Sequence, residues 1–181
     1  MTASPDRERA RWPLFLALAA TVLTVDQVTK VWLVSILPAE GQRLSVIDDL
    51  VRLVHSHNSG ALFGLFKDQA LLFGLVSLGV VALIVWYHGS SGRNTLLSVA
   101  LGLLLGGAVG NLLDRLRLGY VVDFVDAGIG DLRFYTFNAA DAAISCAILL
   151  LLLSALLPQR FGFDRAETKP VSAEPVEPVD A

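Results

Sequence analysis

The sequence predicts a mainly α-helical integral membrane protein, with four transmembrane helices and a small extracytoplasmic β-sheet element and loop. Three observations favour this fold class. The 181 residues are 54% hydrophobic and 17% charged, whereas soluble domains hold about 25% charged residues. The apolar residues are concentrated in four blocks, each long enough to cross a bilayer as a helix of roughly 20 residues. Two of the stretches between these blocks show the alternation and glycines typical of short strands and turns.

The four apolar blocks are the expected membrane helices. They cover residues 12–37, 70–87, 95–113 and 137–157. The first block is no cleaved signal peptide, because it is longer than the apolar core of one and contains Asp26 and Lys30. The third block carries Gly102, Gly106 and Gly110 at a spacing of four. This spacing predicts a face of small residues against which another helix packs closely.

Two polar tails flank the helical part. Residues 1–11 are polar, and residues 158–181 are rich in Pro, Glu and Ala, a composition that predicts disorder. Because the number of crossings is even, both tails lie on one side of the membrane. The Lys and Arg residues of that side are Arg7, Arg9, Arg11, Arg93, Arg160, Arg165 and Lys169, and those of the other side are Arg43, Arg52, Lys67, Arg115, Arg117 and Arg133. The second group is spread over longer loops and mixed with acids, which places the tails in the cytoplasm.

The two loops on the other side have a pattern of their own. Apolar residues alternate at Leu44 and Val46 and again at Val51 and Leu53, which predicts two strands joined by a turn. After the third block, three glycines at positions 119, 128 and 130 surround short β-prone pieces. We therefore expect a small sheet resting on the outer membrane face, over the helix ends.

Ionisable residues inside the apolar blocks are candidates for function, because each costs about 2.5–3.5 kcal/mol to insert into a membrane. Asp26 and Lys30 are spaced i, i+4 on the first helix and can pair. A salt bridge that fixes helix packing explains them as well as chemistry does. Asn111, Asp114 and Arg115 share one face at the outer end of the third helix.

Two further acidic residues are expected at the same depth, near the outer ends of the helices. Asp123 lies within the apolar stretch "VVDFV", and Asp141 lies i, i+3 from Asn138 at the outer end of the fourth helix. One outer loop joins the third and fourth helices, so Asp123 and Asp141 are expected near each other. Two close carboxylates in an apolar wall do not both ionise readily, and such a pair can activate water and protonate a leaving amine. From the residues alone, a packing or ion-relay role remains open beside this protease-like dyad.

Four motifs in this order resemble the family of lipoprotein signal peptidases (signal peptidase II), the bacterial membrane aspartyl proteases that trim prolipoproteins. The motifs are "DQVTK" (26–30), "HNSGALFGLF" (57–66), "GGAVGNLLDRLRLGYVVDF" (106–124) and "FNAAD" (137–141). Each is weak alone, whereas their order and their placement relative to four spans are highly specific. The resemblance covers residues 12–157, which it implies are a four-helix peptidase domain.

The resemblance implies an aspartic endopeptidase that cleaves diacylglyceryl-modified prolipoproteins before the lipidated cysteine. It implies Asp123 and Asp141 as the catalytic dyad. The residues implied to bind substrate are Asn58, Gly60, Asn111, Arg115 and Asn138, and those assigned to support are Asp26, Lys30 and Asp114. The implied enzyme needs no metal or other cofactor. Its implied location is the bacterial cytoplasmic (inner) membrane, as a multi-pass protein with its active site at the extracytoplasmic face.

The implied partners are the lipid-modified prolipoproteins and membrane lipids. We expect a monomer, and no long basic run suggests a nucleic acid partner. The outer loops are candidates for a lid that excludes water.

Two rival interpretations, a transporter or proton relay and a scaffold protein, account for some of these residues. A small transporter or proton relay would use Asp26, Lys30, Asp114 and Asp141, but it predicts acids near mid-membrane on several helices, whereas most gather at one end. A scaffold protein explains the glycines and leaves the acids unexplained.

Three further patterns carry little weight. Residues 128–131 ("GIGD") copy the GxGD signature of presenilin-like proteases, yet they occupy a turn-rich loop, so a glycine turn with an exposed Asp131 is expected. His55 and His57 share one face of a strand, but two ligands are too few for a metal site. His88 follows Trp86 and Tyr87, which predicts an anchor at the membrane interface.

Overall fold

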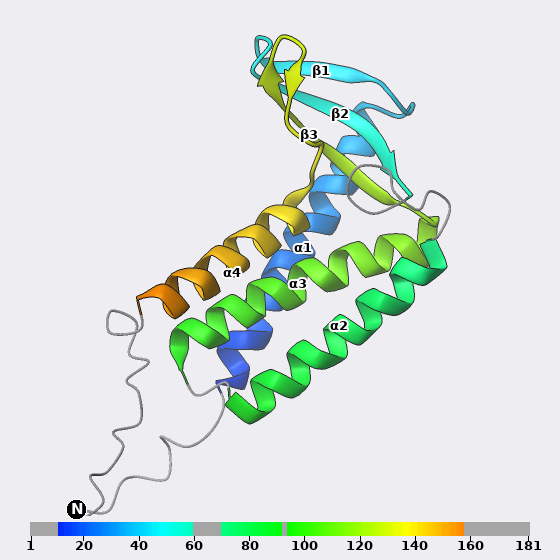
Figure 1. Ribbon diagram of the computed structural model, residues 1–181. Helices are drawn as coiled ribbons and strands as arrows, with labels where there is room; N and C mark the ends of the chain where they lie inside the picture. The colour runs from blue at the N-terminus through cyan, green and yellow to red at the C-terminus, as the bar shows by residue number, and fades with distance from the viewer. Residues whose placement is uncertain (1–10, 60–69, 92–93, 158–181) are drawn as a thin grey trace, which may run out of the picture.

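The computed structural model describes residues 11–59, 70–91 and 94–157. The elements in chain order are α1 (Trp12–Ile36), β1 (Arg43–Ile47), β2 (Val51–Asn58), α2 (Ala70–Ser91), α3 (Thr95–Leu118), β3 (Val121–Ile129), β4 (Leu132–Arg133) and α4 (Ala139–Leu156). The expected four long helices and small sheet are therefore present (Figure 1). Both tails, apart from residue 11, and the predicted disorder of 158–181 lie outside the described residues.

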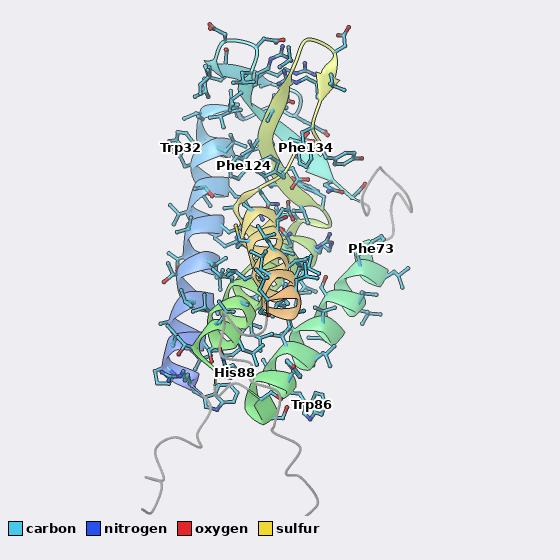
Figure 2. All side chains as sticks on the ribbon, turned by 60° about the vertical axis from the view of Figure 1, so that its left-hand side comes forward. Trp32, Phe73, Trp86, His88, Phe124 and Phe134 are labelled. Atoms are coloured by element: carbon cyan, nitrogen blue, oxygen red, sulfur yellow. The ribbon has the colours of Figure 1, made fainter. Side chains whose placement is uncertain are left out.

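Helix α3 is the centre of the bundle and packs against α1, α2 and α4 (Figure 1). All four helices are long and apolar enough to cross a membrane. Many large apolar side chains point outward from them, as Trp32 and Trp86 do in Figure 2, where they are 50% and 68% exposed. Outward apolar side chains on long helices belong against lipid. The sheet lies beyond one end of the bundle, which we call the sheet end, and we call the opposite one the far end.

The predicted glycine face joins α3 to α1. A Cβ atom added at Gly106 would lie 2.6 Å from the carbonyl oxygen of Ala19, and one at Gly110 would lie 2.6 Å from Oδ2 of Asp26. At Gly102 the added atom would again meet the α1 backbone. The two backbones approach too closely for any side chain on this face, as expected for small residues spaced by four.

Two helices run further than their apolar blocks. Helix α2 continues to Ser91, and α3 continues through its charged last turn to Leu118. Asn94 caps the start of α3 by accepting hydrogen bonds from two backbone N–H groups, and Gly119 ends the helix in the left-handed region at φ +80°. Charged residues end an apolar block in the sequence, whereas the helix itself ends where glycine reverses the backbone.

The sheet is antiparallel throughout, in the order β1-β2-β3-β4. Strand β2 separates two sets of side chains, because alternate residues of a strand point to opposite faces. Leu53 packs with Leu33 and Leu37 at the end of α1, and Nδ1 of His55 lies 2.8 Å from the Leu37 carbonyl oxygen. Leu53 and His55 therefore hold the sheet on the helices, and the pairing of β2 with β3 shifts in register between Leu53 and Ser56.

The prediction for His88 is wrong. This side chain is fully buried near the far end, where it stacks on Phe15 with ring centroids 4.0 Å apart (Figure 2). Its Nε2 atom lies 3.1 Å from the hydroxyl oxygen of Ser98 on α3. Helix α2 continues past Tyr87, and His88 lies on its inner face, where it packs between Phe15 of α1 and Ser98 of α3.

Candidate active site

Asp123 reaches the site from strand β3, where it pairs in register with Ser56 of β2. Its side chain is only 2% exposed. One carboxylate oxygen accepts a hydrogen bond from Nδ2 of Asn58 at 2.9 Å, and the other accepts one from Nδ2 of Asn138 at 2.7 Å. The sheet therefore supplies the first acid and one of the two amides that hold it.

Asp141 reaches the site from the first turn of α4. Asn138 caps this helix, and its side-chain oxygen accepts from the backbone N–H of Asp141 at 2.9 Å, while the Asp141 carboxylate accepts from the backbone N–H of Asn138 at 3.1 Å. This reciprocal arrangement satisfies backbone donors that a helix start leaves free. Nδ2 of Asn111 donates to the other Asp141 oxygen at 2.8 Å. Asn138 thus touches both aspartates, and the helix cap and the acid pair are one structure.

The environment of Asp123 favours a bound proton. Burial and, to a smaller extent, the negative charge of Asp141 raise the pKa of its carboxyl group to about 7, against the opposing hydrogen bonds from Asn58 and Asn138. Two coupled carboxyl groups titrate as a unit. Near neutral pH, such a pair holds one proton, which is the form that can act as an acid and a base together.

A buried ion cluster of Asp26, Lys30 and Asp114 lies next to the two aspartates, on the side of the helices. The Lys30 ammonium lies 2.8 Å from carboxylate oxygens of both Asp26 and Asp114, and it donates to Oδ1 of Asn111 at 3.1 Å. Oδ1 of Asp26 accepts from the backbone N–H of Ala140 at 3.0 Å. Because these residues come from α1, α3 and α4, the cluster fixes the three helices to one another where the aspartates lie.

The expected Asp26–Lys30 pair is therefore present, and it extends further than the i, i+4 spacing suggests. Asn111 is the link to the acids, since its Oδ1 also accepts from Nδ2 of Asn138 at 3.1 Å. On the other side, Oδ2 of Asp114 accepts from the backbone N–H of Val122 at 3.2 Å, directly before Asp123. The cluster therefore positions the backbone of both catalytic candidates.

Gln27 is a member of this cluster that the sequence analysis missed. Its Nε2 atom donates to Oδ1 of Asp114 at 3.0 Å, to Oδ2 of Asp26 at 3.2 Å and to the Gly110 carbonyl oxygen at 3.4 Å. An amide beside Asp26 in an otherwise apolar run was the available signal. At Gly110 an added Cβ atom would collide with Asp26, so the cluster packs here only because this residue lacks a side chain.

Arg115 lies at the edge of the site, half-buried on α3. Its Nη1 atom donates to the Asn111 carbonyl oxygen at 3.2 Å, and its guanidinium faces the charges of Asp141 and Asp123. Gly60, the remaining expected substrate contact, lies outside the described residues, as does the segment 60–69 of the expected lid.

A cavity of about 370 Å³ opens above Asp123. It is lined by Ser56, His57, Asn58, Asp123, Arg133, Phe134, Tyr135 and Thr136. A carboxylate that is almost fully buried thus forms part of the wall of an accessible space at the sheet end of membrane-spanning helices. A peptide bond brought into this cavity can reach the acid pair.

Comparison with known proteins identifies the family. The family described as Signal peptidase (SPase) II matches residues 18–157. The chain belongs to the signal peptidase II family. A lipoprotein signal peptidase of Symbiobacterium thermophilum is 40% identical over 150 residues, covering 82% of this chain and 98% of its own. That of Caulobacter vibrioides is 41% identical over 150 residues, covering 79% and 86%.

Solved structures agree with this assignment. A structure titled as a bacterial membrane enzyme, solved by the in meso method at 2.3 Å resolution, superposes with a TM-score of 0.75 at 27% identity, covering 89% of this chain and 98% of that one. Its companion at 1.9 Å resolution gives a TM-score of 0.73 at 27% identity, covering 83% and 97%. As a signal peptidase II, this multi-pass membrane protein is an aspartic peptidase.

The rival patterns have structural explanations. Residues 128 and 129 are the end of β3, and residues 130 and 131 form the turn to β4, with Gly130 at φ +56° and Asp131 exposed. Nε2 of His57 lies 3.2 Å from Nε2 of His55, so the two histidines bond to each other. The acids and Lys30 of the proposed relay are joined in one compact cluster at the sheet end, which favours a supporting role over transport.

Proposed function

We propose that this signal peptidase II removes signal peptides from diacylglyceryl-modified prolipoproteins by cleaving before the lipidated cysteine, with Asp123 and Asp141 as the catalytic acids. One observation carries the proposal: both carboxylates bond to Asn138, and Asp123 lines a cavity that opens where membrane helices end. The relatives named lipoprotein signal peptidase support the substrate class.

The proposed reaction uses one proton shared by the two acids. Asp123, whose pKa lies near neutrality, keeps the proton, and the ionised Asp141 takes a proton from a water molecule. The resulting hydroxide adds to the scissile carbonyl carbon while Asp123 protonates the carbonyl oxygen. Proton transfer from Asp141 to the amide nitrogen then lets the C–N bond break and releases the cysteine amine. As the bond breaks, the ionised Asp123 takes a proton from one hydroxyl group of the tetrahedral intermediate, so the signal peptide leaves with a new carboxyl group. Both acids are then back in their starting states, and no cofactor is needed.

The residues around the acids are proposed to position water and substrate. Asn58, Asn111 and Asn138 hold the two carboxylates by amide N–H donors, which fixes where a water molecule can lie between them. Arg115 has further N–H groups that can bind a backbone carbonyl or lipid ester oxygen of the substrate. Gly60 is proposed to contact the substrate on the strength of the family resemblance alone. Asp26, Lys30 and Asp114 support this arrangement.

The location proposed is the bacterial inner membrane, with the sheet on the extracytoplasmic face and both tails in the cytoplasm. The four apolar helices and the positive charges of the tails support this topology. Lipid tails of the substrate would stay in the bilayer and hold the scissile bond at the depth of the helix ends, so positioning contributes much of the rate. We propose that the enzyme works as a monomer.

The test is cleavage of a diacylglyceryl-modified prolipoprotein by purified protein in detergent. Asp123→Asn and Asp141→Asn keep the side-chain shape and remove the acid, so each is expected to lower kcat by at least about 10³-fold. Asp48→Asn is the matched control, because Asp48 is exposed in the β1–β2 turn at φ +40°, a conformation that Asn also tolerates. Near wild-type activity in a folded Asp123 or Asp141 variant would remove that residue from the dyad. Cleavage at another bond would refute the site proposed.

A further inference from the structure

Residues along strand β2 form a row that ends at the catalytic candidates. Arg52, Val54, Ser56 and Asn58 follow one another along the strand, and each of them lines a cavity on the sheet. Asn58 is the last of the row and bonds to Asp123. The row therefore leads from the acid pair toward the β1–β2 hairpin, away from the helices (Figure 1).

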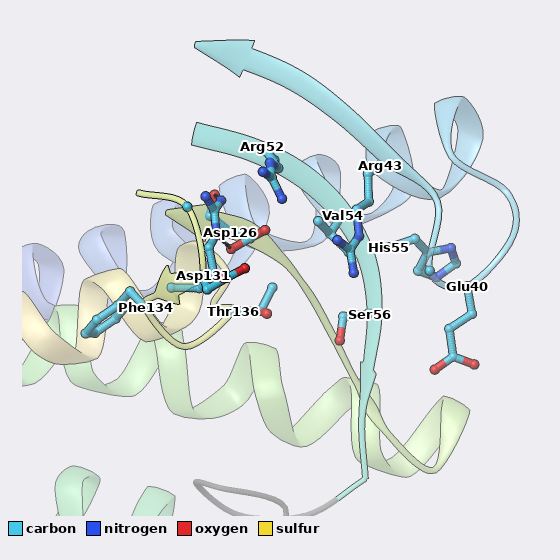
Figure 3. A pocket seen from close by; sticks show the side chains of 13 residues that line it. Glu40, Arg43, Arg52, Val54, His55, Ser56, Asp126, Asp131, Phe134 and Thr136 are labelled. Atoms are coloured by element: carbon cyan, nitrogen blue, oxygen red, sulfur yellow. Dashed lines mark hydrogen bonds and ion pairs between the residues drawn. The ribbon is translucent and has the colours of Figure 1, made fainter. Parts of the chain in front are cut away.

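A second cavity, of about 460 Å³, lies along this row. It shares Ser56, Arg133, Phe134 and Thr136 with the cavity above Asp123. Figure 3 shows the hydroxyl groups of Ser56 and Thr136 near the middle of this space. Two cavities with four common wall residues form one groove, which runs from Asp123 along the face of the sheet.

The charges along the groove are mostly paired. Arg52 forms an ion pair with Asp49, and Nε of Arg133 lies 2.9 Å from Oδ1 of Asp126. Arg43 is exposed and lines the same cavity, and within the ranges 11–59, 70–91 and 94–157 no acidic side chain forms an ion pair with it. Its guanidinium lies beside Val54 in Figure 3, as expected from their register in the β1–β2 pair. Arg43 is thus the charge in this groove that can take an anionic partner from outside.

We propose that this groove binds the substrate segment that follows the lipidated cysteine, and that Arg43 contacts an acidic side chain in it. This inference rests on the proposed function. A chain lying extended along β2 from Asp123 advances about 3.3 Å per residue. Val54, opposite Arg43, is four residues from Asn58, or about 13 Å. The preferred acidic residue is therefore about the fourth after the cleaved bond.

The wall chemistry favours a peptide over a lipid headgroup. Besides its arginines, the cavity wall holds Glu40, Asp126 and Asp131 and the hydroxyl groups of Ser56 and Thr136, a mixture that suits the mixed donors and acceptors of a peptide. The strands that line the cavity lie beyond the helix ends, outside the region that lipid chains would reach (Figure 1). The part of the substrate that leaves the membrane after the cleaved bond is a polypeptide, and it has to pass along this face of the sheet.

A charge-swap experiment tests the groove. Full-length wild type and Arg43→Glu would cleave lipidated prolipoproteins that differ at the fourth residue after the bond, with Asp, Asn or Lys there. An exposed ion pair contributes about 0.2–1 kcal/mol, so wild type should prefer Asp over Asn, and Asn over Lys, by up to about fivefold each in kcat/KM. Arg43→Glu should reverse the order, and salt should weaken both preferences. Moving the charge to neighbouring positions should show the largest effect near the fourth.

The outcomes separate the two proposals. If wild type cleaves none of the three substrates, the proposed function fails, and the groove inference fails with it. If wild type cleaves all three equally, or Arg43→Glu changes all three by the same factor, the function stands and the groove inference is overturned. A uniform change that depends on anionic phospholipid in the micelle would assign Arg43 to a lipid headgroup and would likewise overturn it.

Discussion

The two ends of the helix bundle are held together in different ways. At the far end, Phe15, Leu97, Leu101 and Leu105 form an apolar cluster that packs by shape. At the sheet end, Lys30 and its acidic and amide partners join the same helices through buried hydrogen bonds and ion pairs. Phe15 at the far end and Asp26 at the sheet end are both fully buried, so the difference between the ends lies in chemistry and not in burial.

The comparison shows that the sheet end is not built for maximal stability. A buried ion cluster gives little or no net stability over apolar packing, because desolvation of the charges offsets their attraction. Apart from the His88–Ser98 pair, apolar packing holds the far end, so the sheet end could have been mostly apolar too. What the polar cluster adds is the fixed position of Asn111, Ala140 and Val122, the groups that hold the two aspartates. The polar end is therefore built for position, and the apolar end for stability.

The largest effect is expected from Lys30→Met. Met fills similar volume but leaves Asp26 and Asp114 facing each other without a compensating charge. Removing one partner of a buried ion pair destabilises a protein by about 3–5 kcal/mol. Reversible unfolding in detergent micelles measures this loss. Adding Asp26→Asn and Asp114→Asn to Lys30→Met removes the unpaired charges and should recover most of the stability, while activity stays low. Equal stability of Lys30→Met and wild type would contradict the role of the cluster.

A smaller effect is expected where the bundle is held by shape. In Gly106→Ala the new Cβ would lie 2.6 Å from the Ala19 carbonyl oxygen and 2.7 Å from Cβ of Val22, so α1 has to move away. Overpacking of this kind costs about 1–3 kcal/mol. Gly79→Ala on α2 is the control, because nothing lies within 4 Å of its added atom and Ala favours the helix. The same micelle unfolding assay should show loss for the first variant and none for the second.

Much of this fold could be predicted from the sequence, because its signals are local. Length and apolarity predict the four helices, and spacing by four predicts the Gly106 face. Alternation predicts β1 and β2. The ends of α2 and α3 were less clear, since charge ends an apolar block before Gly119 ends the helix. His88 was misjudged for the same reason: one further turn of helix converts an interface residue into a buried one.

The sequence predicts which residues form the site better than it predicts the hydrogen bonds that join them. Asp123 and Asp141 stand out as acids in apolar surroundings, and the loop between their elements brings them together. That Asn138 bonds to both, or that Gln27 joins Asp26 to Asp114, depends on side-chain directions across three helices. Such contacts have no periodic pattern in one sequence. The free charge of Arg43 is likewise visible only once the acids near it are seen to pair with other residues.

The acid pair predicts a pH profile that Asn58 should shift. Asp123 loses its proton as the pH rises through its pKa of about 7, so kcat/KM should fall by up to tenfold per pH unit above that value. The Asn58 amide donates to this carboxylate and favours its charged form, so Asn58→Ala should raise the pKa of Asp123 further. The loss of a hydrogen bond worth about 1 kcal/mol corresponds to a pKa change of somewhat less than one unit, so the alkaline limb should move to higher pH by that amount.

The stability of the fold should follow the same titration. Because the pKa of Asp123 is raised on folding, its contribution is fully present below about pH 4 and is lost as the pH rises through about 7. Asp123→Asn should remove this dependence, so the variant should gain relative to wild type at pH 8 and not at pH 4. In the kcat/KM profile, an alkaline limb that does not move in Asn58→Ala would show that a group other than Asp123 titrates there.

The smallest effect is expected at the polar pair of the far end. Among the described residues, Nδ1 of His88 has no hydrogen-bond partner, and its Nε2 bonds only to Ser98. In the double variant His88→Phe with Ser98→Ala, both polar partners leave together and the ring can still stack on Phe15. Replacing both partners of a buried hydrogen bond by apolar groups is nearly neutral, so the loss should stay below about 1 kcal/mol, with cleavage unchanged. A loss as large as that of Lys30→Met would show that polar bonds hold both ends, and the division between a positioning end and a stabilising end would have to be given up.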